Sequence, residues 1–389
     1  MKKIVLMSLV ASGILMAGGY KIPEVSTNAV ALGAANIAHN KNADAAYYNP
    51  ANMVWMEDTN HMQFNAMYIG LDEVQFSGTN EHAKKEGFLI PSFHYVSPKL
   101  GDSGARIGVS VVVPGGLSKR WEGPVGKRSS EEFTLETIEI NPTAAFEITP
   151  ELAVAVGFRM IHSNGIVKNA AYDMTGDGLN FGYNFALAYT PVKSLELGVT
   201  YRSKISLDLD GSTSRILTPS NTDVSVSVPL PAALNLAVAY TFPSKTTLEF
   251  VYERTYWSAY SDLDFDFTDP RAEGAFGASH PKDWKDTNTF RLGITQEIGD
   301  FDVMAGLVFD ETPVPDATIG FELPDSDSVA VSLGGSYSIT DKWDVYVSGL
   351  YSMHDKRNAT VDVGRGTLVN GEFSNADVLI LSTGFGFKF

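Results

Sequence analysis

The sequence predicts an all-β protein, a closed antiparallel transmembrane β-barrel of about fourteen strands. An export signal opens the chain, and a period-2 alternation of large and small residues recurs from about Asn60 onward. After the signal, no stretch approaches the ~20 apolar residues that a spanning helix needs. A membrane protein of this kind can only be a closed barrel, because an open sheet would leave unpaired backbone groups in lipid. A soluble periplasmic protein is the competing class.

The first seventeen residues are expected to be the export signal. Two lysines precede the apolar stretch from Ile4 to Met16, and small residues follow from Ala17. Cleavage after Ala17 would make Gly18 the first residue of the mature chain. Leu15, at the third position back, is larger than the small residue usually preferred there, so the cut could lie a few residues away. An uncleaved N-terminal anchor is the alternative, but the apolar stretch is too short to span a bilayer.

The next segment, residues 18–58, is rich in alanine and lacks the period-2 pattern. It is expected to form short helices and turns that close at Asn49-Pro50-Ala51. The barrel would then occupy residues 59–389.

The alternation is clearest where Leu234, Leu236, Val238, Tyr240 and Phe242 are separated by small or polar residues. One strand face is therefore large and apolar, and the other is small. Short turn signals alternate with longer polar stretches, which is the outer-membrane arrangement of short turns and long loops. Counting such segments gives about fourteen strands, to within two. They begin near residues 60, 88, 104, 132, 152, 178, 194, 222, 246, 287, 302, 328, 342 and 375.

The final strand alternates Phe385, Phe387 and Phe389 with small or polar residues, and the chain ends on Phe389. A terminal strand of this kind resembles the assembly signal of bacterial outer-membrane barrels. It predicts that the barrel-assembly machinery engages the strand that ends at Phe389. The last strand of a soluble sheet could show the same pattern by chance.

Composition fits this class of protein. Aromatic residues make up 11% and charged residues only 19% of the chain, as expected when half of each strand faces lipid. Acidic residues outnumber basic ones by 46 to 29, which argues against a nucleic-acid partner. The chain has no cysteine, so disulfides, thiolate metal sites and a cysteine nucleophile are excluded. The seven histidines show no metal-ligand or nucleophile-elbow context, so neither an enzyme nor a metal site nor a cofactor is expected.

A series of motifs resembles, in order, the outer-membrane family of long-chain fatty acid and aromatic hydrocarbon transporters (FadL/TodX-like, OMPP1). The resemblance covers nearly the whole mature chain, and several motifs in the right order are much more specific than any one alone. They are Tyr48-Asn49-Pro50-Ala51, Tyr201-Arg202-Ser203-Lys204, Tyr252-Glu253-Arg254-Thr255-Tyr256-Trp257-Ser258, Asp283-Trp284-Lys285-Asp286, Phe309-Asp310-Glu311-Thr312-Pro313 and Leu323-Pro324-Asp325-Ser326-Asp327.

The resemblance implies a monomeric, 14-stranded barrel in the outer membrane of a Gram-negative bacterium, in contact with its lipid and lipopolysaccharide. Residues 18–58 would be a hatch that plugs the lumen, with Asn49, Pro50 and Ala51 as its motif. The implied function is passive uptake of hydrophobic compounds, which bind in the lumen and leave sideways into the membrane. A general porin or a structural or adhesive barrel is the alternative function.

The lateral exit implied by the family lies where the third strand is kinked, here at Pro114, Gly115 and Gly116. Proline cannot donate to the strand ladder and glycine packs nothing, so pairing with the neighbouring strand should lapse there. The same residues could equally be the turn that ends the strand.

Ligand binding is expected from Leu117, Trp121 and Phe133, whose side chains offer apolar area for capture. Lys285 stands where the family has a lumenal lysine for the ligand's carboxylate, and Lys168 lies beside a second basic position. Lys285 could instead pair with a neighbouring aspartate, and the lysine- and arginine-containing loop that holds Trp121 could contact lipopolysaccharide phosphate. If only one lumenal cation remains, neutral hydrocarbons become plausible ligands. Fatty acid, alkane and monoaromatic ligands all stay open, because apolar pockets separate them weakly.

Overall fold

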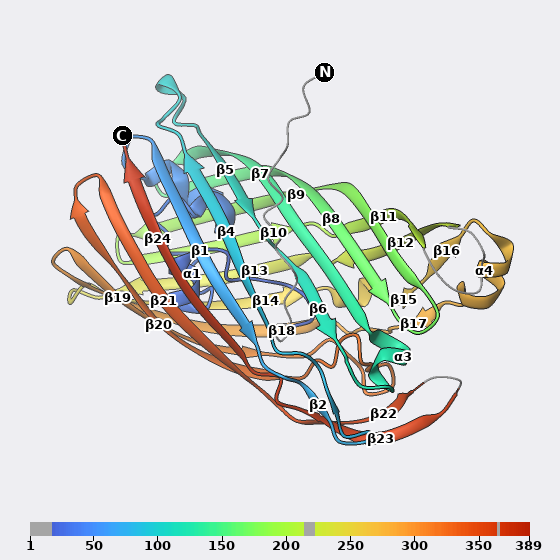
Figure 1. Cartoon of the computed structure of the whole chain (residues 1–389). Helices are drawn as coiled ribbons and strands as arrows, with labels where there is room; N and C mark the ends of the chain where they lie inside the picture. Colours follow the sequence, from blue (N-terminus) through green and yellow to red (C-terminus); the bar gives the residue numbers. More distant parts are fainter. Residues whose placement is uncertain (1–17, 214–221, 364–365) are drawn as a thin grey trace.

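The structure, a computed structural model, describes residues 18–213, 222–363 and 366–389; the predicted signal, residues 1–17, lies outside the described residues. Within these ranges fourteen antiparallel strands close into a barrel (Figure 1). In chain order they are β1 (His61–Leu71), β4 (Glu86–Val96), β5 (Arg106–Val112), β7 (Glu132–Thr149), β8 (Leu152–Lys168), β9 (Asp173–Val192), β10 (Leu195–Arg202), β13 (Ala233–Thr241), β14 (Thr246–Thr255), β18 (Thr287–Ile298), β19 (Phe301–Asp310), β20 (Ser328–Thr340), β21 (Trp343–His354) and β24 (Val378–Lys388).

Pairing of the first strand with the last closes the barrel. The ladder between β1 and β24 runs from His61 opposite Lys388 to Leu71 opposite Val378. At its end the backbone N–H of Asn60 donates to the carbonyl of Phe389 at 3.1 Å, and the N–H of Phe389 donates to the carbonyl of Asn60 at 3.2 Å. The predicted closed barrel is confirmed, and the terminal phenylalanine completes its seam.

The large apolar face of each strand points outward. In β13, Leu236, Val238 and Tyr240 are exposed while Ala237 and Ala239 between them are buried. Large apolar side chains that are exposed to this extent on strand after strand form a lipid-facing surface. No helix of the described residues is long and apolar enough to cross a membrane.

Turns at one end of the barrel are short, and connections at the other end are long and structured (Figure 1). Three of the long connections extend the barrel sheet through β6 (Gly116–Arg120), β11 (Ile205–Thr213), β12 (Thr222–Leu230) and β16 (Phe265–Phe267). The remaining elements at this end are β2 (Gln75–Phe76), β3 (Glu81–His82), α3 (Gly126–Ser130), η3 (Trp257–Ala259), β15 (Asp262–Leu263), α4 (Pro270–Phe276), β17 (His280–Pro281), β22 (Arg357–Asp362) and β23 (Leu368–Ser374).

The third strand, predicted to begin near residue 104, is divided into β5 and β6 at Pro114 and Gly115, where the sequence predicted either a kink or the end of the strand. One strand prediction needs correction. The segment predicted to begin near 222 starts as β12, and the barrel strand β13 follows only after Pro231 and Ala232 interrupt it.

Residues 18–58 lie against the inward-facing side of the barrel wall. They contain α1 (Thr27–Leu32), α2 (Ala45–Tyr48) and the 3-10 helix η1 (Pro50–Trp55). Their alanines are buried, and a Cβ on Gly306 of β19 would lie 2.4 Å from the carbonyl carbon of Leu32. The small residues on both surfaces therefore allow close packing of helix against strand.

Backbone groups of this segment bond to polar side chains of the wall. The side chain of Glu249 accepts hydrogen bonds from the N–H groups of Ile37 at 2.7 Å and Ala38 at 2.6 Å. The hydroxyl of Ser348 donates to the carbonyl of Thr27 at 2.8 Å. Buried backbone groups outside regular structure need such partners, and the polar inner face of the barrel supplies them.

A charge on the predicted lipid face should destabilise the barrel according to its depth. Leu333, in the middle of β20, is 64% exposed, and Ile339 lies on the same face near the short turn. We expect Leu333→Arg to cost about 2–4 kcal/mol and Ile339→Arg about 0–1 kcal/mol, measured by urea unfolding in lipid vesicles. Equal costs for the two variants would contradict a membrane-spanning β20.

Candidate functional site

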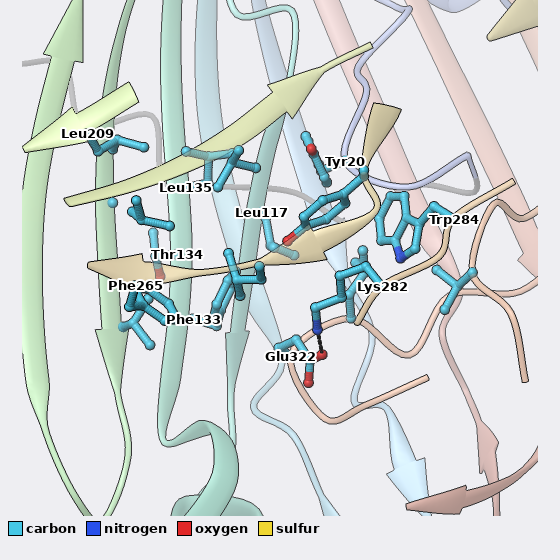
Figure 2. Close-up of a pocket in the computed structure, with 18 of the residues that line it drawn as sticks. Tyr20, Leu117, Phe133, Thr134, Leu135, Leu209, Phe265, Lys282, Trp284 and Glu322 are labelled. Carbon is cyan, nitrogen blue, oxygen red and sulfur yellow. Dashed lines mark hydrogen bonds and ion pairs between the residues drawn. The ribbon is translucent and has the colours of Figure 1, made fainter. Parts of the chain in front are cut away.

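An apolar cavity of about 630 Å³ lies between the barrel wall and the long connections (Figure 2). The wall contributes apolar side chains from β6, β7, β11 and β16, and the N-terminal segment contributes Tyr20. The apolar lining includes Leu117, Leu135, Leu209, Val226, Phe265 and Leu323.

One ion pair is the main polar feature of this cavity. Lys282 Nζ lies 2.5 Å from Glu322 Oε1, and both side chains line the cavity (Figure 2). Burial alone would raise the pKa of Glu322, but the Lys282 ammonium holds that pKa below its usual value. Glu322 is therefore ionised at neutral pH, and it neutralises the charge of Lys282. The cavity as a whole offers an apolar surface with little net charge.

Tyr20 is held among three aromatic rings from the long connections. Its ring centroid lies 4.8 Å from that of Trp257 and 5.7 Å from that of Trp284. The Tyr20 hydroxyl donates a hydrogen bond to the carbonyl of Pro229. Gly19 has φ +78°, and a Cβ there would lie 2.7 Å from the Trp257 ring, so only glycine lets the chain pass these rings.

The wall beside this cavity is interrupted between β5 and β6. The ladder that joins β4 to β5 is short: it begins with Phe93 opposite Val111 and ends with Val96 opposite Gly108. In the described part of the chain no ladder joins β4 to β6, whose partner is β7. The second and third strands of the barrel are therefore unpaired over the first half of β4.

The N-terminal segment supplies backbone partners at this interruption. Ile22 N–H donates to the Pro114 carbonyl at 2.9 Å, and Gly116 N–H donates to the Tyr20 carbonyl at 2.8 Å. Lys21 stands opposite Gly115 in an antiparallel bridge. The predicted Pro114-Gly115-Gly116 site is thus a break within a barrel strand, and residues 20–22 lie along its inner side.

A second cavity, of about 620 Å³, lies on the other side of the same segment. Lys21, Ile22, Pro23 and Pro114 line it, together with the buried charged side chains Arg159, Glu253 and Arg291 and the partly buried Arg202. Glu253 accepts from Lys21 at 2.6 Å and from Arg291 at 3.2 Å. Since Tyr20 lines the first cavity and its next three neighbours line the second, residues 20–23 separate an apolar chamber from a charged one.

The sequence-predicted ligand residues fall in different places. Leu117 and Phe133 line the apolar cavity. Trp121 is 1% exposed and lies behind the lining, where its indole N–H donates to the Phe321 carbonyl at 2.8 Å. Lys168 forms an ion pair with Glu132 at 3.0 Å.

Lys285 has an exposed side chain and is not among the residues that line either cavity; Lys282 lines the apolar one instead. Asp283, between the two lysines, has φ +49°, a left-handed conformation that redirects the chain. Sequence reasoning did not single out Lys282, Glu322 or Tyr20 as lining residues. A basic residue beside Trp284 was the available signal, but it did not say which of the two lysines points inward.

The Asn49-Pro50-Ala51 motif connects two parts of the N-terminal segment to the wall. The Asn49 amide donates to the carbonyls of Ile37 at 2.9 Å and of Leu187 in β9 at 3.2 Å, and its oxygen accepts from the Ala51 N–H at 3.2 Å. Pro50 occupies the first position of η1, where a missing N–H costs nothing. The motif thus anchors the later half of the segment.

Comparisons with known proteins agree with this architecture. The family model described as outer membrane protein transport protein (OMPP1/FadL/TodX) matches residues 8–389. The "Long-chain fatty acid transport protein" of Escherichia coli O6:H1 is 22% identical over 406 residues, which cover 88% of this chain and 87% of that protein. "Outer membrane protein P1" of Haemophilus influenzae is 21% identical, with 93% and 94% covered.

Solved structures show the same fold. The Pseudomonas aeruginosa FadL homologue superposes with a TM-score of 0.86 at 18% identity, covering 96% of this chain and all of that one (100%). The Pseudomonas putida toluene transporter TodX gives a TM-score of 0.75 at 13% identity, with the same coverage of 96% and 100%. The chain therefore belongs to the OMPP1/FadL/TodX family, whose members are outer-membrane transport channels of Gram-negative bacteria and not enzymes.

Proposed function

We propose that this protein carries hydrophobic compounds into the outer membrane by binding them in the apolar cavity and releasing them sideways between β5 and β6. Residues 18–58 act as the hatch, and residues 20–23 are its moving part. The observation that carries the proposal is that Tyr20 lines the cavity while its own carbonyl bonds to Gly116 at the interrupted strand. A ligand that displaces Tyr20 therefore also disturbs the contact that covers the interruption.

Passive partitioning supplies the driving force. Moving one CH₂ group from water into an apolar environment gains about 0.8 kcal/mol, whether that environment is the cavity or lipid. The free energy of a bound compound therefore changes little when it passes from the cavity to the membrane, provided that it does not become hydrated on the way. The route through the charged second cavity and onward into water would forfeit this gain. The sideways route keeps the compound in apolar surroundings throughout.

The electrostatics of the apolar cavity favour neutral compounds such as alkanes or monoaromatics. A carboxylate ligand could use Lys282 only by displacing Glu322, which would leave that acid buried without its cation. Long-chain fatty acids are the second candidate class, favoured by the function named for the Escherichia coli relative and by the presence of two lysines in this segment. A general porin is disfavoured because residues 18–58 pack across the inside of the wall.

Removing the charge of Glu322 should strengthen the binding of fatty acids and leave the binding of neutral compounds nearly unchanged. In Glu322→Gln the Lys282 ammonium loses its partner, so we expect affinity for a long-chain fatty acid to rise by about tenfold, or about 1.4 kcal/mol. A neutral aromatic such as toluene should bind within about twofold of wild type, because it does not contact the charge. Calorimetric titration of the detergent-solubilised protein measures both.

Two lysine variants are the matched controls for that titration. Lys282→Gln combined with Glu322→Gln should abolish the gain in fatty acid affinity, while Lys285→Gln should leave it unchanged. If Lys285→Gln alone weakens fatty acid binding in the wild-type background, the exposed lysine holds the carboxylate, and the role proposed for Lys282 is wrong.

A disulfide between the hatch and the interrupted strand should block transport. Lys21 and Gly115 are a non-hydrogen-bonded antiparallel pair, for which Cα atoms lie about 4.5 Å apart, within the range that disulfides span. The chain has no cysteine of its own, so Lys21→Cys with Gly115→Cys creates a single thiol pair. Oxidised protein should lose uptake of labelled hydrocarbon in proteoliposomes, and a reductant should restore it.

Each single-cysteine variant, treated with the same oxidant, controls for the substitution itself. Their uptake should not respond to oxidation. Wild-type rates in the oxidised double variant would show that residues 20–22 do not have to move, and would remove the sideways route as proposed.

A further inference from the structure

Carboxyl groups surround the backbone of Gly18 and Gly19, where the described chain begins. Gly19 N–H donates to Asp325 Oδ2 at 3.3 Å, and the Thr312 hydroxyl donates to the same oxygen at 2.6 Å. A Cβ built on Gly18 would lie 2.7 Å from Asp310 Oδ2. Glu24, which is 2% exposed, has one carboxyl oxygen, Oε2, without a hydrogen-bond partner among the described residues.

This cluster contains more acids than bases. Lys21 and Arg291, the nearby cations, both form their ion pairs with Glu253. Arg291 also acts electrostatically on Glu24 and Asp310, so two cations serve four carboxyl groups, those of Glu24, Glu253, Asp310 and Asp325.

Cations on the other side of Asp325 do not balance the cluster. Arg357 donates to the backbone carbonyl of Asp325 at 2.8 Å, and its ion pair is with Asp316. Lys119 and His354 line a small cavity with Asp325, without an ion pair to it among the described residues.

Before the signal is removed, the nitrogen of Gly18 is an uncharged amide. The buried carboxyl groups of the cluster then outnumber the cations that could stabilise their charged forms. Burial raises the pKa of both Glu24 and Asp325 to about 7, because their charged forms are poorly stabilised there. A metal ion does not fit as the balancing charge, since the described residues contain no group of three or more acids or histidines arranged to hold one. A cation small enough to fit beside a glycine would relieve this cost.

We propose that the N-terminal ammonium of the mature protein, created at Gly18 by removal of the signal, is this cation. It would bind between Asp310 and Asp325 and hold the start of the hatch against the connection that follows β19. Hydrolysis of the Ala17–Gly18 peptide bond by a signal peptidase consumes one water, leaves a carboxylate on Ala17 and an amine on Gly18. The amine takes up a proton at neutral pH, since α-amino groups have pKa values of about 7.7–8.0.

The geometry places the new charge within reach. On one tetrahedral carbon, a nitrogen and a Cβ lie about 2.5 Å apart, so the nitrogen of Gly18 is within about 5.2 Å of Asp310 Oδ2. Gly18 has φ +83° and lacks a side chain, so rotation about its backbone can close the remaining distance to an ion pair. The anchor would form only after processing, and it lies two residues before Tyr20.

The proposal is tested on the mature protein purified from outer membranes. Intact mass and N-terminal sequencing should show a chain that begins at Gly18. The rate of reductive methylation of the α-amine at pH 8 should be at least roughly fourfold lower in the folded protein than after unfolding, because an adjacent carboxylate pair raises the pKa of the amine by about one unit or more. At pH 10 the folded protein should react nearly as fast as the unfolded one.

Isosteric variants separate charge from simple burial. Asp310→Asn combined with Asp325→Asn should restore fast labelling at pH 8, while Asp300→Asn, at an exposed short turn, should not. Insertion of one glycine between Ala17 and Gly18 leaves every carboxylate in place but moves the ammonium by about 3.5 Å, and it too should restore labelling.

A mature chain that starts at another residue would overturn the proposal. Slow labelling that persists at pH 10, or in the double aspartate variant, would equally overturn it, since the protection would then be steric. None of these measurements involves transport, so their outcome is independent of the function proposed above.

Discussion

Lipid imposes one constraint on which this structure depends: every backbone N–H and C=O within the membrane needs a partner in the protein. Thirteen of the fourteen strands are unbroken elements paired on both sides, within the described residues. The third strand, broken at Pro114, departs from this pattern, and there the backbone of Tyr20 to Ile22 takes the place of the missing ladder. The N-terminal segment therefore completes the wall at the point where the wall itself is incomplete.

The interior is divided into chambers of different chemistry. The apolar chamber is closed by aromatic rings around Tyr20, and the neighbouring chamber contains Lys21, Glu253 and Arg291. Buried charges of this kind are stable only when paired, so ion pairs hold the charged side chains beside residues 21–23 in place. On the proposed route, a hydrophobic compound would pass more readily through the backbone contact at the interrupted strand, toward lipid, than into the neighbouring chamber with its buried charges.

Sequence predicted the barrel well because its signal is repeated. Each strand carries its own period-2 pattern, so an error at one end, such as the late start of β13, does not disturb the count. The site was predicted less well because it is built from long connections, where side-chain direction follows individual backbone angles. Lys282 rather than Lys285 lines the cavity, with Asp283 between them in a left-handed conformation, and no periodicity encodes that arrangement. Trp121 was predicted to bind the ligand; it does not line the cavity, and its indole N–H bonds to the Phe321 carbonyl, so its role in binding stays a prediction.

The two halves of residues 18–58, the proposed hatch, are held very differently. Asn49 fastens the later half to Ile37 and to Leu187 of the wall, whereas the first residues are held at the interruption by two backbone hydrogen bonds and the Lys21 ion pair. The proposed opening would therefore require only residues 20–23 to shift, while the alanine-rich helices stay in place. By the proposed sideways route, a bacterium would admit oily nutrients without giving sugars, salts or water-soluble antibiotics a continuous aqueous path through its envelope.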